Sequence, residues 1–285
     1  MVRGAKLGAM PVPPAPETLV DLERYPVTEL ASPAARAVIA AGRGSLAERG
    51  VAILPGFVRP DALEAMVKAT EALRPRAFLE DVSVGTPYLG LPDESFPEGH
   101  PRRTSVRSTT WVLAYDLVPR SSPVRVLYEW DVLLAFFGEL LERHPLYRMA
   151  DPLGALNLTA MTEGHVQGWH FDSTDFVVSL ALQASEGGGL FECAPFIRSE
   201  TEEHYDDVAG VISLRDRARV PVIPMVPGTL MVFQGRHSVH RVTPVEGPRP
   251  RFVALFGYDT KPGTQSSDLL KKIRYGRTEP VPARD

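Results

Sequence analysis

Cysteine is nearly absent from this sequence. Cys193 is the only one in 285 residues, so no disulfide can form within the chain, and a reducing cytoplasm is the expected compartment. No apolar run approaches the roughly 18 residues that a membrane helix requires, and the proline-rich N-terminus lacks the apolar core of a signal peptide. Basic charge is not in excess either: the net charge of −4 argues against a nucleic-acid partner.

A phosphate-binding loop is also missing. The glycine run EGGG (186–189) has no phosphate-loop lysine beside it, so it predicts a hairpin turn and not a nucleotide site. These absences leave a soluble cytoplasmic protein that acts on a small molecule, with no nucleic-acid or membrane partner. Its assembly as a homodimer is allowed by the sequence.

The first half of the chain contains the expected helices. Helical patterns cover 33–49, a stripe beginning at residue 59, and 123–144, and a strand is expected at 51–58. Residues 76–108 are polar and rich in glycine, proline and arginine. A loop of that length inside a domain is usually functional, which makes it the natural lid for a site.

The pattern becomes β-like after residue 154. Seven short apolar segments follow one another up to residue 260, separated by glycine, proline and glutamate turns, with one helical insertion after residue 198. Such spacing predicts a sandwich or barrel, in a chain whose 27 prolines and 23 glycines suit numerous turns.

Domain boundaries follow from these patterns. We expect a proline-rich N-terminal arm at 1–30 and a single domain at 31–265, with its β core at about 109–260. The remaining residues, 266–285, form a polar tail expected to run over the surface.

The segment QGWHFDSTDFVVSLALQ (167–183) holds the most informative residues. Alternate residues of a strand face the same side, so His170 and Asp172 should point together while Phe171 faces apolar packing. A neutral imidazole and a carboxylate at a barrel mouth are two thirds of a facial triad of two histidines and one carboxylate. That triad holds non-haem Fe(II) and leaves three coordination positions open.

A later strand should supply the third ligand. The sequence offers His237 and His240, which face opposite sides of a regular strand, and His240 is favoured. Arg251, at the head of the last strand, could hold the far carboxylate of a chelating dicarboxylate. Arg249 is its competitor, although its place between two prolines in a turn predicts solvation.

Other polar residues are candidates for orienting a ligand near the mouth, with packing as the alternative role for each. Asn157 is expected to bind the co-substrate, and the residues expected to bind the substrate are Gln167, Trp169, Ser173 and Asp175.

Two further groups could bind the charged ends of a free amino acid. The cluster Arg102, Arg103 and Arg107 is interpreted as a solvated loop face, with a clamp for a substrate carboxylate as the alternative. Glu129 and Asp131, in YEWD, could bind an ammonium group or could simply cap and pack a helix.

Several motifs, in one order, resemble the Fe(II)/2-oxoglutarate-dependent dioxygenases. Within that superfamily, YEWD, ADPLGALN, GWHFDSTDFVVSLALQ, GGLFECAPFIR, GRHSVHRVTPVEGPRPR and YDTKPG resemble the bacterial branch of lysine-type, free-amino-acid radical halogenases and their hydroxylase relatives. The resemblance covers roughly residues 45–265. It implies a mainly β (α+β) fold, a double-stranded β-helix core of jelly-roll or cupin type with N-terminal supporting helices.

The resemblance also implies a set of cofactors and residue roles. It implies Fe(II), 2-oxoglutarate and O2 as cofactor and co-substrates, with His170, Asp172 and His240 on iron and Arg251 on 2-oxoglutarate. Halogenases of this branch have glycine or alanine where the carboxylate ligand would stand, which frees a position for chloride. This chain has Asp172 there, so hydroxylation of an unactivated C–H bond, with a free amino acid or derivative as substrate, is the expected reaction.

Other activities fit the same residues. Desaturation or cyclisation would use the same iron chemistry, and a metal-dependent hydrolase or isomerase could use the same three ligands with Zn²⁺. A barrel that only binds a small molecule is a further alternative, against which the intact ligand pattern speaks.

Overall fold

A computed structural model describes residues 12–282. The expected N-terminal arm therefore lies partly outside the described residues. From residue 12 onward it is packed on the domain: Leu19, Val20 and Val27 are buried in the core, and Val20 forms a β-bridge with Val58. This part of the arm contributes to the hydrophobic core.

The helices have clear start and stop signals. In α1, the Ser32 side chain accepts a hydrogen bond from the Ala35 N–H, and Gly50 closes the helix in the left-handed conformation. The helices are α1 (Pro33–Arg49), α2 (Pro60–Leu73), α3 (Pro123–Glu129), α4 (Asp131–Leu141), α5 (Tyr205–Ile212) and α6 (Asp268–Tyr275).

The strands are short, as the turn-rich sequence predicts. They are β1 (Val51–Leu54), β2 (Phe78–Gly85), β3 (Val106–Leu113), β4 (Tyr147–Arg148), β5 (Leu156–Met161), β6 (Gln167–His170), β7 (Val177–Gln183), β8 (Gly187–Gly188), β9 (Phe191–Ala194), β10 (Val222–Ile223), β11 (Leu230–Phe233), β12 (Val239–Val242), β13 (Val245–Glu246), β14 (Arg251–Phe256) and β15 (Tyr258–Asp259).

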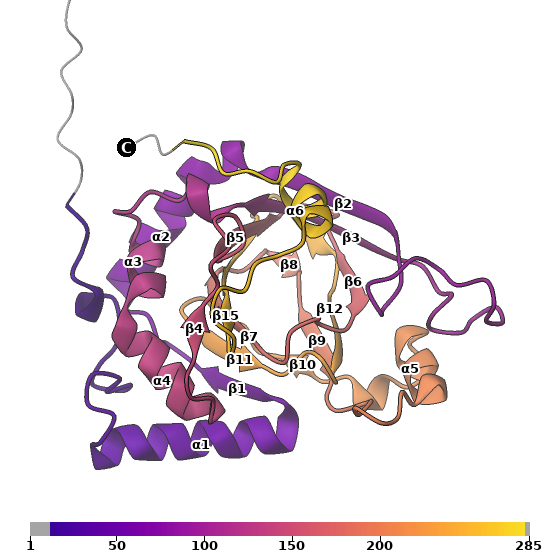
Figure 1. The fold of residues 1–285 in the computed structure, drawn as a ribbon, viewed down its shortest axis with the longest axis horizontal. Helices are drawn as coiled ribbons and strands as arrows, with labels where there is room; N and C mark the ends of the chain where they lie inside the picture. The colour runs from indigo at the N-terminus through magenta and orange to yellow at the C-terminus, as the bar shows by residue number, and fades with distance from the viewer. Residues whose placement is uncertain (1–11, 283–285) are drawn as a thin grey trace, which may run out of the picture.

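One curled antiparallel sheet organises the domain (Figure 1). Its strand order is β1-β11-β7-β14-β5-β3-β6-β12-β9-β10, and β2 pairs with β3. Side chains from both ends of this order meet in one interior cluster, since Val51 of β1 and Met231 of β11 pack with Phe191 of β9 and Val242 of β12. The sheet therefore closes on itself, which confirms the expected double-stranded β-helix.

Alternating residues separate the two faces of the sheet. On β7 and β14, Val178, Leu180, Phe252 and Ala254 face outward into the main core beneath the N-terminal helices. Figure 1 shows α1 to α4 together along that side of the sheet. The residues of the opposite parity face the barrel interior, and Ser179 and Arg251 are polar residues among them.

The long helix expected at 123–144 is two helices that meet at Trp130, whose backbone is extended. The break is stabilised by Arg148, which donates hydrogen bonds to the carbonyls of Tyr128 and Glu129 and pairs with Asp131 at 2.8 Å. These contacts satisfy carbonyl groups that the end of α3 leaves free. The sequence could not show this, because Arg148 lies beyond both helices.

The expected loop at 76–108 is shorter than predicted. Its first part forms β2, which pairs antiparallel with β3, so the irregular segment runs from 86 to 105. β2 is mostly half exposed and lacks a clean apolar alternation, which is why its sequence resembled a loop.

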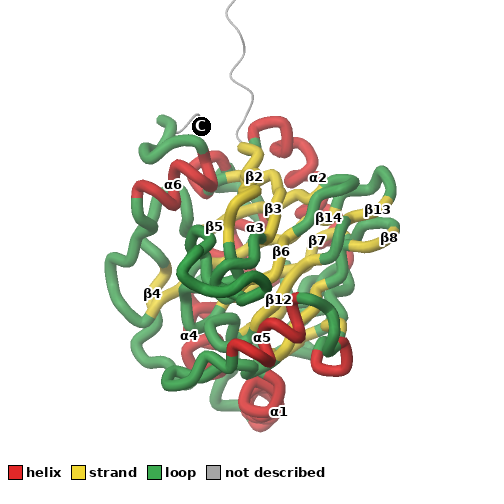
Figure 2. Tube along the Cα trace, turned by 90° about the vertical axis from the view of Figure 1, so that its right-hand side faces the viewer, coloured by secondary structure: helices red, strands yellow, loops and turns green. Residues whose placement is uncertain are grey.

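The tail also differs from expectation, because α6 packs against the sheet. Ser267 caps its start, Gly276 ends it in the left-handed conformation, and Lys271 and Tyr275 are buried. Figures 1 and 2 both place α6 beside β2, far from α1. The polar composition of the tail hid a helix whose buried side chains are themselves polar.

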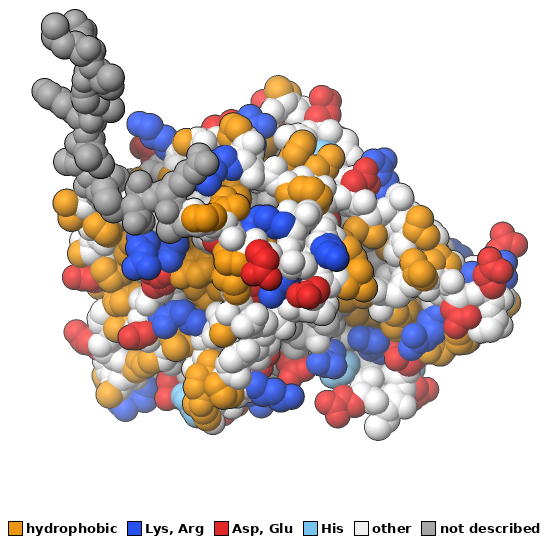
Figure 3. Space-filling model, turned by 45° about the horizontal axis from the view of Figure 1, so that its top comes forward, with side chains coloured by type: hydrophobic (Ala, Val, Ile, Leu, Met, Phe, Trp, Pro, Cys, Tyr) orange, Lys and Arg blue, Asp and Glu red, His pale blue; other side chains and the backbone are white. Residues whose placement is uncertain are grey.

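Surface charge is mixed on the face that Figure 3 shows, where acidic and basic side chains alternate over the molecule. This agrees with the absence of a net basic charge. Within residues 12–282, no helix has both the length and the apolar character needed to span a membrane.

The contact between α1 and α4 gives a stability prediction. A Cβ at Gly42 would lie 2.4 Å from Leu140 Cδ1, whereas a Cβ at Gly44 in the same helix meets nothing within 4 Å. We expect Gly42→Ala to lower the free energy of unfolding by about 1–3 kcal/mol through overpacking. Gly44→Ala, the matched control, should raise it by about 0.5–1 kcal/mol. Urea denaturation measures the free energy of unfolding of both variants. Equal changes in the two variants would contradict the close contact between Gly42 and Leu140.

Candidate metal centre

Strand pairing brings two histidines together inside the barrel. His170, the last residue of β6, lies directly opposite His240 of β12 in the antiparallel register. Because paired residues share a face, both imidazoles point inward, and their ring centroids are 4.1 Å apart. His237 is not part of this group: of the two histidines that the sequence offered, the structure brings His240 to His170.

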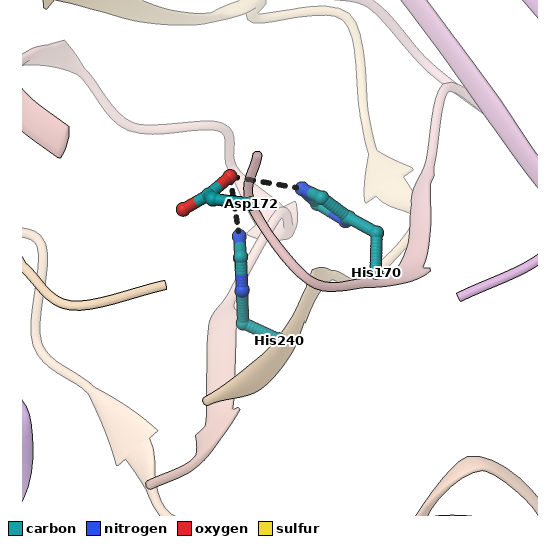
Figure 4. Close-up of side chains that lie close together, drawn as sticks. All are labelled: His170, Asp172 and His240. Atoms are coloured by element: carbon teal, nitrogen blue, oxygen red, sulfur yellow. Dashed lines mark ion pairs between the residues drawn. The ribbon is translucent and has the colours of Figure 1, made fainter. Parts of the chain in front are cut away.

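Asp172 joins them from just beyond β6. Its Oδ1 lies 3.9 Å from His170 Nε2 and 3.6 Å from His240 Nε2 (Figure 4). We expected a strand to carry both His170 and Asp172, yet β6 ends at His170. Asp172 is held by a hydrogen bond from its N–H to the Gly235 carbonyl, 3.1 Å long. One potential ligand atom from each of the three residues lies within 4.8 Å of the others.

Backbone carbonyls set the tautomers of both histidines. His170 Nδ1 lies 2.8 Å from the Gly168 carbonyl, and His240 Nδ1 lies 2.9 Å from the Ser238 carbonyl. A carbonyl can only accept, so each Nδ1 carries the proton and each Nε2 keeps its lone pair. Both lone pairs are directed toward Asp172, the arrangement that orients histidine ligands in metal sites.

The electrostatic surroundings also suit a cation. Burial, with a smaller contribution from neighbouring His240, lowers the pKa of His170 to about 4, so its ring is neutral at pH 7. Asp172 Oδ2 is buried and has no hydrogen-bond partner among the described residues. A buried carboxylate oxygen without a partner is costly unless a cation or donor satisfies it. The donor set of two imidazoles and one carboxylate therefore fits a divalent metal ion.

Gly235 leaves the space that Asp172 occupies. A Cβ on Gly235 would lie 1.7 Å from Asp172 Oδ2, so no larger residue fits without moving the carboxylate. Gly235 stands five residues before His240, in the loop between β11 and β12. The sequence alone did not identify this role.

Arg251 and Arg249 have different environments. Arg251 begins β14 and faces the barrel interior, where burial lowers the pKa of its guanidinium to about 10. Among the described residues its guanidinium has neither a hydrogen-bond acceptor nor a carboxylate partner. Arg249 instead donates a hydrogen bond to the Ser185 carbonyl at 3.2 Å. Of the two, Arg251 is the one free to bind an anion.

Asn157 is close to the interior but already has protein partners. Its Nδ2 donates to the carbonyls of Leu153 and Leu156, and its Oδ1 accepts a hydrogen bond from the Tyr275 hydroxyl at 2.9 Å. The structure therefore places Asn157 as an anchor for α6. A direct contact between its side chain and a co-substrate would require breaking one of these bonds.

The expected substrate residues next to the triad lie in different directions. Gln167 Nε2 is 3.5 Å from His170 Nε2, so Gln167 borders the triad. Trp169 faces the other side of β6, buried in a separate cluster beneath the guanidinium of Arg241. Ser173 accepts a hydrogen bond from Arg236 through its carbonyl, and Asp175 pairs with Arg236 at 2.6 Å.

The remaining expected residues are not brought to the triad. Glu129 lies on α3, where its carboxylate contacts Tyr115 and pairs with Arg125 at 2.8 Å. Arg103 is in the 86–105 loop and donates to the Phe96 carbonyl at 3.0 Å. Arg102 likewise stays within the protein, bonded to Tyr205 at 2.6 Å.

Sequence reasoning missed two charged residues on the inner face. Arg274 of α6 and Glu80 of β2 lie 3.9 Å apart, and the charge of Arg274 acts on His170 and Asp172. They fall in the two segments whose structure was not expected. No local signal marked them, because one stood in a supposed loop and the other in a supposed tail.

Comparison with solved structures agrees with the fold. The α-ketoglutarate-dependent carbocyclase SnoK from nogalamycin biosynthesis is 14% identical, with a TM-score of 0.54 over 95% of this chain and 97% of that chain. The α-ketoglutarate-dependent epimerase SnoN from the same biosynthesis is also 14% identical, with a TM-score of 0.55 over 87% and 92%. AviO1 from Streptomyces viridochromogenes Tue57 is 18% identical, with a TM-score of 0.52 over 79% and 96%. At such identities the likeness shows the fold.

No curated protein matches the sequence. One protein family, named halogenase D (HalD), does match the sequence. The match covers residues 98–273, from the loop before β3 to α6. The match contains all three residues of the triad and covers more than half of the sequence. The chain therefore belongs to the halogenase D family.

Proposed function

We propose that this protein is a non-haem Fe(II)/2-oxoglutarate-dependent dioxygenase that hydroxylates an unactivated C–H bond of a small molecule, a free amino acid or a derivative of one. The observation that carries the proposal is the triad itself: two imidazole nitrogens with free lone pairs and one carboxylate without a full set of partners, together inside the barrel. Two histidines and a carboxylate are the ligand set of non-haem Fe(II) oxygenases.

Three residues would hold the iron: His170, Asp172 and His240. Bound iron would supply the oxidative chemistry, in which the substrate, O2 and 2-oxoglutarate give the hydroxylated substrate, succinate and CO2. The protein fixes the orientation of these three side chains before a metal binds. The carbonyls of Gly168 and Ser238 fix both rings, and the space beside Gly235 fixes the carboxylate.

Arg251 would bind the far carboxylate of 2-oxoglutarate. Its guanidinium is inside the barrel, stays charged with its pKa at about 10, and has no acidic partner among the described residues. A guanidinium binds a carboxylate with two parallel hydrogen bonds, which fixes both the position and the orientation of the acid. The names of the similar structures SnoK and SnoN, both α-ketoglutarate dependent, agree with this co-substrate.

Asp172 is the reason to propose hydroxylation within a family named for a halogenase. Its Oδ1 lies within 4 Å of both histidine nitrogens, so on a bound metal the carboxylate would fill the position that chloride needs. A halide ligand requires that position to be vacant. The residue at position 172 therefore favours transfer of oxygen to the substrate.

The 86–105 loop is proposed as the cover of the site. It is tied directly to the metal-binding segment, because the Phe171 N–H donates a hydrogen bond to the Pro87 carbonyl at 2.8 Å. Tyr88 of the loop packs on Phe171, with ring centroids 5.2 Å apart. These contacts fix the start of the loop on the face of β6 that carries Trp169, beside the segment of His170 and Asp172, and from this anchor the rest of the loop would cover the site and exclude water during oxidation.

The central test measures succinate. Incubation of the protein with Fe(II), 2-oxoglutarate, ascorbate and O2 should yield succinate, and the yield should rise when the correct amino acid is added. Asp172→Ala should lower turnover at least 100-fold, because it removes one of three metal ligands. Addition of chloride to the wild-type enzyme should give no chlorinated product.

Two results would refute this assignment. Full activity of Asp172→Ala would exclude Asp172 as a ligand. Failure of the wild-type protein to form succinate, together with tight Zn²⁺ binding, would favour the rival hydrolase or isomerase on the same ligands.

The choice between the two arginines has its own test. We expect Arg251→Met to raise the Kd for 2-oxoglutarate at least tenfold, since a charged hydrogen-bond pair is lost. Arg249→Met is the matched control and should change this Kd less than twofold, because Arg249 binds a backbone carbonyl. Anaerobic titration with Fe(II) and 2-oxoglutarate measures both values. A larger effect of Arg249→Met would reverse the assignment.

The space around Asp172 gives a further prediction. Gly235→Ala introduces a methyl group where Asp172 Oδ2 now lies, so we expect the affinity for Fe(II), or for Co(II) as a substitute, to fall at least tenfold. Gly90→Ala is the control, since a Cβ there meets nothing within 4 Å. Metal titration followed by absorption spectroscopy reads out both. Unchanged metal affinity in Gly235→Ala would mean that Asp172 is not held as described.

A further inference from the structure

Arg274 is a charged side chain inside the barrel without a hydrogen bond. Its Nε is shielded from solvent and has no partner, and none of its N–H groups donates to an acceptor among residues 12–282. Yet 28% of the side chain remains accessible. A guanidinium has five donors, and leaving them unpaired in the interior is costly. The accessible part of Arg274 is therefore suited to receive acceptor atoms from a ligand.

Glu80 is the nearest acidic neighbour and is also without a hydrogen bond. Its Oε2 lies 3.9 Å from Arg274 Nε, too far for a hydrogen bond, and 16% of its side chain is accessible. The two groups thus form a loose ion pair. Each keeps its hydrogen-bonding capacity, Arg274 as a donor and Glu80 as an acceptor.

The pair faces the barrel interior, on a rigid support. Phe78 and Glu80 share one face of β2, and a Cβ on Gly276, the residue that ends α6, would touch the Phe78 ring. On α6, Tyr275 is bonded to Asn157 of β5 at 2.9 Å. These contacts fix the helix against β2 and β5, so the position of Arg274 is set by the fold.

The metal triad lies within electrostatic range of Arg274. Burial alone would lower the pKa of Arg274, but its interactions with Glu80, Tyr275 and Asp172 outweigh burial and raise the pKa, so the group stays protonated. The register of the sheet places the pair on the side of His170: Glu80 is paired with Thr110 of β3, and Ser108, two residues earlier on β3, is paired with Gln167, which borders His170. A ligand bound by Arg274 and Glu80 would therefore lie on the side of the barrel that carries His170.

Arg274 and Arg251 are separate anion-binding groups. Arg251 is on β14, whereas Glu80 is on β2, and β5 and β3 lie between those strands in the sheet. Three strand spacings correspond to about 14 Å along the sheet. With 2-oxoglutarate held by Arg251, Arg274 can bind a second anion.

We propose that Arg274 and Glu80 together recognise the carboxylate and the ammonium group of a free α-amino acid, the substrate of this enzyme. The inference rests on the proposed dioxygenase function and assigns its substrate-binding residues. A zwitterion offers the acceptor that the guanidinium lacks and the donor that the glutamate lacks. It also brings no net charge into the barrel, which limits the cost of its burial.

The test uses the full chain under anaerobic conditions, loaded with Fe(II) and 2-oxoglutarate. Each of the twenty common L-α-amino acids is added, and the change in the visible charge-transfer band gives a Kd. For the amino acid that binds most tightly, Arg274→Met should raise the Kd at least tenfold, and so should Glu80→Gln. The α-amide of that amino acid should bind wild type weakly and should be insensitive to Arg274→Met.

Matched controls exist on the same elements. Lys272 is exposed on α6, and Asp81 follows Glu80 but pairs with Arg107 on the opposite face of β2. Lys272→Met and Asp81→Asn should change the amino-acid Kd less than twofold. Calorimetric binding of 2-oxoglutarate should be unchanged in all four variants.

Three outcomes would overturn the inference while leaving the proposed function intact. In the first, the wild-type protein binds Fe(II) and 2-oxoglutarate but responds to no amino acid. In the second, the Arg274→Met and Glu80→Gln variants bind the amino acid as tightly as the controls do. In the third, Arg274→Met loses 2-oxoglutarate binding, which would place Arg274 in the oxoacid site. If the wild type bound neither Fe(II) nor 2-oxoglutarate, the proposed function would fail first, and the inference with it.

Discussion

The antiparallel pairing of β6 with β12 is the constraint on which the site depends. It sets His170 opposite His240, and a shift of one residue would turn one of the two rings out of the barrel. The same strands supply the means to orient the rings, because each histidine bonds to a backbone carbonyl two residues earlier in the chain. The register of the sheet therefore fixes the presence of the ligands, their direction and their tautomer at once.

Charge inside the barrel follows a second constraint. Asp172 and Glu80 are acidic, Arg251 and Arg274 are basic, and His170 is neutral at pH 7, so the charges of these five groups sum to zero. A divalent cation and the dianion of 2-oxoglutarate also cancel each other, and a zwitterionic substrate adds nothing. In the proposed complex each charged group then gains a partner of opposite sign, without a net charge being moved into a medium of low dielectric constant.

The sequence was a good guide where periodicity and local signals decide the structure. Proline and glycine at its two ends mark α1, and the short apolar segments after residue 154 predict the strands of the barrel. The spacing of His170 and Asp172 indicated that they would meet, although the reason differs. Asp172 is placed by a bond to Gly235, a residue distant in sequence, and not by the alternation of a strand.

Segments governed by tertiary contacts could not be predicted in the same way. β2 exists because it pairs with β3, and the split between α3 and α4 is stabilised by Arg148, a later residue. Asn157 was expected to flank the mouth of the barrel and to bind the co-substrate. Only the structure shows that the Tyr275 hydroxyl already occupies its side-chain oxygen.

The hydrogen bond between Tyr275 and Asn157 connects the helix that carries Arg274 to the β core. Asn157 belongs to the β core that carries the triad, while Tyr275 belongs to a helix near the end of the described chain. By anchoring α6 to β5, the pair holds Arg274 at the barrel interior without drawing on β6 or β12, the strands of the histidine pair. The proposed substrate-binding residues and the proposed metal ligands thereby rest on different elements. A change on α6 would then alter which molecule is bound while the register of β6 and β12 stays the same.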